Sequence, residues 1–120
     1  MMPKLFKTSL AVYTQAEWSG KNDSGWTAFA DHVIILPDHL ASKSAGGVDI
    51  PDDVVDRMTM AAEAGVVVSV GEEAFKGLTV APKPGDRVSI GRYSGQLLMG
   101  SDTKTYRIMS ASEIGAIYAQ

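Results

Sequence analysis

The sequence predicts a mainly β protein, built as a small β-barrel, because short apolar segments alternate with turn-forming residues through most of the chain. The two strongest strand signals are the aliphatic runs at 31–36 and 66–71. Shorter candidate strands follow at 87–91, 97–99, 105–109 and 114–118. Gly, Pro, Asp and Ser residues separate these segments, a pattern typical of small all-β domains. The 12 glycines also suit a barrel, because its corners need bulges and backbone with positive φ.

Composition limits the classes of function. The chain has 120 residues, 45% of them apolar, which suits one domain or one domain with an arm. A net charge of −3 without any Lys/Arg cluster excludes a basic surface for nucleic acid. The absence of cysteine excludes disulfides and thiolate metal sites. No apolar run approaches the roughly 20 residues that span a bilayer, so a cytoplasmic protein that does not enter the membrane is expected.

Residues 1–30 differ from the rest and are expected to form an N-terminal arm on a domain that spans 31–120. The segment is polar and turn-rich without periodicity, yet it contains Trp18, Trp26 and Phe29. A disordered tail would hold fewer aromatic residues. Two interpretations stay open: the arm packs on its own domain, or these aromatic side chains bind a neighbouring subunit or another protein.

A short helix is predicted between the two strongest strands, at 51–64. Pro51 suits the first helical position, and the aspartates that follow it favour the positive end of the helix dipole. Val54, Met58 and Ala61 recur with helical spacing. Gly65 is expected to end the helix. The alternative is a loop that stays irregular up to Gly65.

The stretch just before this predicted helix, residues 46–50, contains the most distinctive candidate site. Gly46 and Gly47 are followed by the half-apolar run Val48, Asp49 and Ile50. Adjacent glycines add backbone freedom and no side chain to bury, so they are unsuited to a core element. A flexible loop with a small apolar hook is typical of recognition of a groove on another protein. An ordered surface loop without a partner remains the alternative.

Several short motifs occur in a fixed order between about Asp31 and Tyr118. They are Pro37-Asp38, Ser42-Lys43-Ser44-Ala45-Gly46-Gly47-Val48, Gly65-Val66-Val67, Ser69-Val70-Gly71, Lys83-Pro84-Gly85-Asp86-Arg87-Val88, Tyr93-Ser94-Gly95, Tyr106-Arg107-Ile108 and Ser112-Glu113-Ile114. In this order they resemble the GroES (chaperonin-10) co-chaperonin family, and they are most similar to its divergent bacteriophage-type members.

The resemblance implies a GroES-like β-barrel and a homo-oligomer, a sevenfold ring closed by pairing of terminal strands. It implies a GroEL-type chaperonin as partner, with the mobile-loop region at 42–64 and a shortened roof segment at 72–81. The chaperonin-binding loop would comprise Gly46, Gly47, Val48, Asp49 and Ile50. The ring would cap the folding chamber without a cofactor of its own, because the partner binds ATP or ADP. Phe75, in the roof segment, would either pack as a core residue or face the lumen of the ring.

Asp49 departs from the family pattern, in which three consecutive apolar residues follow the glycine pair. An unpaired carboxylate is costly to bury. Because side chains of an extended segment alternate in direction, Val48 and Ile50 can face a groove while Asp49 faces solvent. One such hook binds weakly, but seven hooks on one ring gain avidity.

No arrangement of residues points to catalysis or to a bound metal, so the protein is not expected to be an enzyme. His32 and His39 lack the spacing of a ligand pair. Asp52, Asp53 and Asp56 lack the spacing of a calcium loop. These residues are expected to serve as ordinary strand, loop and helix-start positions.

An alternative function is that of a phage virion structural protein, a capsid decoration or head–tail component that reuses the barrel. The added arm, Asp49, the short roof segment and the predicted helix favour this alternative. Such a protein would bind a capsid protein through its arm and reside in the virion, whereas a phage-encoded co-chaperonin would act in the host cytoplasm. Fold analogy alone does not decide between the two functions.

Overall fold

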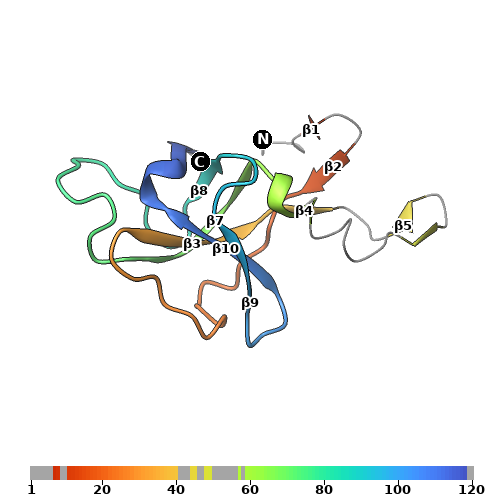
Figure 1. The fold of residues 1–120 in the computed structure, drawn as a ribbon, viewed down its shortest axis with the longest axis horizontal. Coiled ribbons are helices and arrows are strands. Elements are labelled where there is room, and N and C mark those ends of the chain that lie inside the picture. The colour runs from red at the N-terminus through yellow and green to blue at the C-terminus, as the bar shows by residue number, and fades with distance from the viewer. Residues whose placement is uncertain are drawn as a thin grey trace.

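The computed structural model describes residues 7–8, 11–40, 44–45, 48–49, 57 and 59–118. Its largest element is a six-stranded antiparallel sheet with the strand order β11-β8-β7-β3-β10-β9 (Figure 1). The strands are β3 (His32–Pro37), β7 (Ala64–Val70), β8 (Arg87–Ile90), β9 (Gln96–Met99), β10 (Thr105–Ser110) and β11 (Ile114–Ile117). A single 3₁₀ turn, η1 (Ala111–Glu113), joins the last two. The prediction of a mainly β fold is confirmed.

The described residues also form two small sheets. In the first, β1 (Lys7–Thr8) pairs with β2 (Ala11–Thr14), and β2 pairs in turn with β4 (His39–Leu40). The second is a hairpin of β5 (Ser44–Ala45) and β6 (Val48–Asp49). Figure 1 shows this hairpin at the far end of the molecule, away from the six-stranded sheet.

The central strand β3 is buried on both of its faces, which explains its uninterrupted aliphatic run. Alternate residues of β3 contribute to two different core clusters. The first cluster comprises Val33, Ile35, Val67, Ala74, Val88, Ile90 and Met109. The second comprises Ala28, Ile34, Leu36, Val68 and Tyr106, with Ala16, Trp18, Leu98 and Ile108 packed against it. Residues from the N-terminal segment therefore help to cover one face of the sheet.

Between β6 and β7 the structure shows helix at Arg57 and at Thr59, Met60 and Ala61, while residues 51–56 and 58 lie outside the described residues. The predicted end of this helix at Gly65 is wrong, because Gly65 is the second residue of β7. It lies opposite Pro37 of β3. A Cβ at Gly65 would lie 2.6 Å from the Leu36 carbonyl oxygen, so a close approach of two strands requires this glycine.

Consecutive turns, without any strand, form the described segment between β7 and β8 around residues 72–77. Phe75 has a φ of 59° and packs, partly buried, against the first core cluster. Its contact with the core agrees with the first of the two positions considered for it. Within the part of the chain that the structure describes, no helix is long and apolar enough to cross a membrane.

Candidate functional site

The predicted recognition loop contains the β5–β6 hairpin. Ala45 pairs with Val48 and Ser44 with Asp49, so only Gly46 and Gly47 connect the two strands. Gly46, Gly47 and Ile50 lie outside the described residues. A two-residue connection is the commonest hairpin loop, and it requires positive φ that glycine adopts without steric cost. The backbone thus places Val48 and Asp49 at consecutive strand positions near the tip of the hairpin.

The two ends of this loop meet at one point of the sheet. The Asp38 N–H, just after β3, donates to the Ala64 carbonyl at 3.0 Å, at the start of β7. Farther along, the Ile90 N–H donates to the Glu63 carbonyl at 2.9 Å. The residue where the chain leaves β3 is therefore hydrogen-bonded to the residue where it enters β7, and this bond fixes the base of the loop.

A buried ion pair fixes the outgoing end of the loop. Two guanidinium nitrogens of Arg87 donate to the two carboxylate oxygens of Asp38 at 2.9 and 2.6 Å. Both side chains are almost fully buried, and the Ala16 N–H donates a further hydrogen bond to Asp38 at 3.0 Å. Such a bidentate pair with an added backbone donor satisfies the carboxylate in place of water. Asp38, at the loop entrance, is thus buried and connects three segments: the end of β3, the start of β8 and the N-terminal segment.

Arg107 fixes the returning end. Its guanidinium, in the centre of β10, is fully buried and donates to the carbonyls of Ala62, Gly91 and Ser94. Ala62 lies between the loop helix and β7, and the other two carbonyls belong to the turn after β8. The rigid planar fork of an arginine reaches several acceptors that one ammonium group does not span. Arg107 thereby ties the loop to the rest of the sheet.

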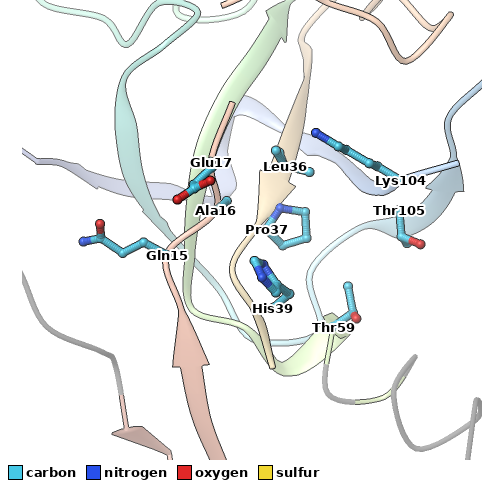
Figure 2. A pocket seen from close by; sticks show the side chains of 9 residues that line it. All are labelled: Gln15, Ala16, Glu17, Leu36, Pro37, His39, Thr59, Lys104 and Thr105. Atoms are coloured by element: carbon cyan, nitrogen blue, oxygen red, sulfur yellow. The ribbon is translucent and has the colours of Figure 1, made fainter. Parts of the chain in front are cut away.

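A pocket of ≈ 540 Å³ lies beside the loop base. It is lined by Gln15, Ala16, Glu17, Leu36, Pro37, His39, Thr59, Lys104 and Thr105 (Figure 2). Leu36 and Pro37 give it apolar walls, whereas Glu17 and Lys104 bring opposite charges to it. Figure 2 shows that its lining comes from the N-terminal segment, the end of β3, β4, the helical stretch at Thr59 and the start of β10. The pocket therefore lies where the N-terminal segment meets the base of the loop.

The three aromatic residues proposed as a partner-binding arm have different surroundings. Trp18 packs against the second core cluster, and its buried indole N–H has no hydrogen-bond partner among the described residues. Trp26 is half-exposed, and its indole N–H donates to the Met99 carbonyl of β9 at 2.8 Å. Phe29 is 81% exposed. Of these side chains, Phe29 is therefore the most accessible to a partner.

Tyr106 and Asp102 form a hydrogen-bonded pair in the β9–β10 hairpin, where the tyrosine hydroxyl donates to the carboxylate. Burial raises the pKa of Tyr106 well above its usual range, and the bond to Asp102 raises it further. The same bond lowers the pKa of Asp102. Both shifts favour the neutral phenol beside the charged carboxylate.

We expect the melting temperature to fall as the pH rises above about 10, the usual pKa of tyrosine. The unfolded chain then loses a proton that folded Tyr106 retains, so stability decreases with pH. Melting curves between pH 8 and 11 check this, and Tyr106→Phe should make the decline shallower. Tyr93→Phe, at an exposed position, serves as the control and should leave the decline unchanged. An equally steep decline in Tyr106→Phe would contradict the assignment.

The two histidines occupy separate places. His32 is exposed at the start of β3, with its ring Nδ1 3.2 Å from the Phe29 carbonyl and 3.3 Å from Asp31. His39 lines the pocket at the loop base. The described residues contain no group of three side chains that could hold a metal ion. Asp52, Asp53 and Asp56 lie outside them.

The fold and site define a small β-protein that presents a long loop with a terminal hairpin from a fixed base. A family model described as "Chaperonin 10 Kd subunit" matches residues 26–118. This match covers well over half of the sequence, and the chain belongs to the chaperonin 10 family. The prediction of a GroES-like protein is thereby confirmed at the level of the family.

Similar proteins in other organisms are named co-chaperonin GroES. The chain is 38% identical over 88 residues to the co-chaperonin GroES of Bacteroides fragilis, which covers 73% of this chain and 91% of the relative. It is 39% identical to that of Bacteroides thetaiotaomicron with the same coverage. It is 37% identical over 92 residues to that of Chlorobium luteolum, covering 75% and 94%. These relatives are bacterial co-chaperonins and give no support to a bacteriophage-type member or to the virion alternative.

Proposed function

We propose that this chain acts as a co-chaperonin that docks its loop, residues 42–64, onto a GroEL-type chaperonin and caps the folding chamber. Membership of the chaperonin 10 family carries the proposal. The three relatives described above, each named co-chaperonin GroES, share more than a third of their aligned residues with it. The role is capping rather than catalysis, in the cytoplasm where a chaperonin folds its clients. ATP or ADP belongs to the partner, and this chain needs no cofactor.

The position of the β5–β6 hairpin suits docking. It lies far from the six-stranded sheet (Figure 1), whereas the loop base is fixed by Asp38 and Arg107. A groove on the partner can therefore receive the tip without contact between the two globular bodies. A loop anchored at both ends also has fewer conformations to lose on binding than a free peptide.

The edges of the main sheet suit a ring of several copies. Within the described chain, β11 and β9 are the two edge strands. Ile117, the last residue of β11, and Tyr118, which follows it, are more than a third exposed. An uncovered edge strand offers unpaired backbone groups to another chain. We infer that neighbouring copies pair along such edges in a heptameric ring, with Trp26 and Phe29 contributing contacts between subunits.

In the docked loop that we propose, Val48 and Ile50 would serve as apolar anchors, and Asp49 would face solvent. Each anchor contributes roughly 1.5–3 kcal/mol when it is fully buried, before the cost of ordering the loop is subtracted. A single loop therefore binds weakly. Several loops on one ring bind together with a much higher avidity, because all later contacts are intramolecular.

The double change Val48→Ser/Ile50→Ser is expected to abolish capture of the protein by a GroEL-type chaperonin in the presence of ATP or ADP. Both anchors lose their apolar contact, and the loss is repeated in every copy of the ring. A pull-down with purified chaperonin measures this. The matched control is Leu78→Ser/Val80→Ser, which removes two exposed apolar side chains outside the loop. Equal capture of the hook variant and the intact protein would contradict the assigned hook, and no capture of the intact protein would contradict the function.

A further inference from the structure

The N-terminal segment contacts residues 39–40, the stretch that leads into the loop at 42–64. Strand β2 pairs with β4, with Tyr13 opposite Leu40 and Thr14 opposite His39. β4 is the last described stretch before the β5–β6 hairpin. Residues 11–16 lie outside the part that the family model matches, which begins at residue 26. A segment from outside the matched region thus supplies the partner strand for the outgoing end of the loop.

A second contact joins the same two segments. The Ala16 N–H donates to the Asp38 carboxylate at 3.0 Å, and the bidentate bond from Arg87 holds that carboxylate in place. Asp38 directly precedes β4. The N-terminal segment therefore forms a hydrogen bond with Asp38 and also pairs with β4.

The next part of the segment is anchored on the sheet. Ala16 and Trp18 pack against the second core cluster, and Ala28 is buried in it. Hydrogen bonds from Trp26 to Met99 and from the Ser101 N–H to the Ser24 carbonyl attach this stretch to the β9–β10 hairpin. Because residues 16–28 are held in this way, β2 reaches β4 without the full entropic cost of closing a long free chain.

We propose that residues 11–16, here called the N-terminal brace, order residues 39–40, the stretch that leads into the chaperonin-binding loop, before the partner arrives. The inference rests on the proposed co-chaperonin function. Residues 39–40, which the brace pairs, have already lost backbone freedom in the free protein. The loop therefore loses less entropy on docking, which strengthens binding without a new contact to the partner. In a ring, this gain is repeated in each loop.

Two pairs of variants test the brace by hydrogen exchange of the free protein. Deletion of residues 1–14 removes β1 and β2, whereas deletion of residues 1–6 leaves both strands. In the full chain, Tyr13→Pro/Thr14→Pro removes two consecutive N–H groups, one of which must face β4, and Tyr13→Ala/Thr14→Ala keeps both. We expect the amide of residues 39–40 that faces β2 to exchange about tenfold faster or more in the first variant of each pair. The exchange of β3 and β7 should stay slow, which shows that the sheet is intact.

Binding to a purified GroEL-type chaperonin with ADP is measured on the same proteins, and the first variant of each pair should bind about tenfold more weakly. Unchanged exchange at residues 39–40 would overturn the brace. Faster exchange with unchanged affinity would overturn its effect on docking. If the intact protein does not bind the chaperonin, the proposed function fails, and the exchange rates alone still decide whether residues 11–16 order residues 39–40.

Discussion

Arg87→Met is expected to lower the free energy of unfolding by about 3–5 kcal/mol, the cost of removing one partner from a buried ion pair. The change takes away both guanidinium donors of the Asp38 carboxylate, which is left buried with the Ala16 N–H. A carboxylate without a counter-charge in such a place is poorly solvated. Urea unfolding followed by tryptophan fluorescence measures the loss.

The size of this effect depends on burial, which a matched control isolates. Lys83→Met removes the exposed cation that pairs with the partly buried Asp86, and it should cost at most about 1 kcal/mol. In the double variant Asp38→Leu/Arg87→Met no charge is left unpaired, so it should lose less stability than the sum of the two single changes. A cost below about 1 kcal/mol for Arg87→Met alone would show that the pair is not buried in solution.

The strands of the main sheet could be predicted from the sequence because their signal is local. Four consecutive aliphatic residues mark β3, and a similar run marks β7. Turn residues separate the later strands, so each was placed within one or two residues of its observed bounds. A strand that is buried on both faces has a continuous apolar run, and this run can be recognised in the sequence without knowing which strands lie beside it.

The pairing of distant segments could not be predicted in the same way. Strands β1, β2 and β4 are two to four residues long and have no periodic pattern of their own. Asp38 has the local signature of a turn residue, and only its contact with Arg87, far along the chain, makes it a core residue. Gly65 has the local signature of a helix end, but its proximity to β3 decides its role.

One signal for the fixed loop base was present in the sequence. Arg87 is the first residue of β8 and Arg107 the third residue of β10, and an apolar residue follows each of them. A charged residue at a buried strand position requires partners that satisfy it. These partners could not be predicted from the sequence. Only the fold brings Asp38 to Arg87 and the backbone carbonyls to Arg107.

Arg107→Met is expected to destabilise the protein by about 2–6 kcal/mol, because each buried acceptor left without its donor costs roughly 1–3 kcal/mol. The carbonyls of Ala62 and Ser94 lose the guanidinium, while that of Gly91 keeps the Ser94 N–H. Thermal and urea unfolding measure the effect. Arg92→Met is the matched control, since Arg92 is exposed and 4.0 Å from Glu63, and it should cost at most about 1 kcal/mol.

Arg107→Lys separates the shape of the side chain from its charge. One ammonium group does not reach the Ala62 carbonyl, on the loop side, and the carbonyls of the 91–94 turn together. We therefore expect Arg107→Lys to retain less than half of the stability that Arg107→Met loses. Amide exchange near Ala62 should also stay fast in both variants, because the returning end of the loop is then no longer tied to β10. Full recovery by Lys would mean that the positive charge alone holds this end of the loop, and that the three-carbonyl geometry does not.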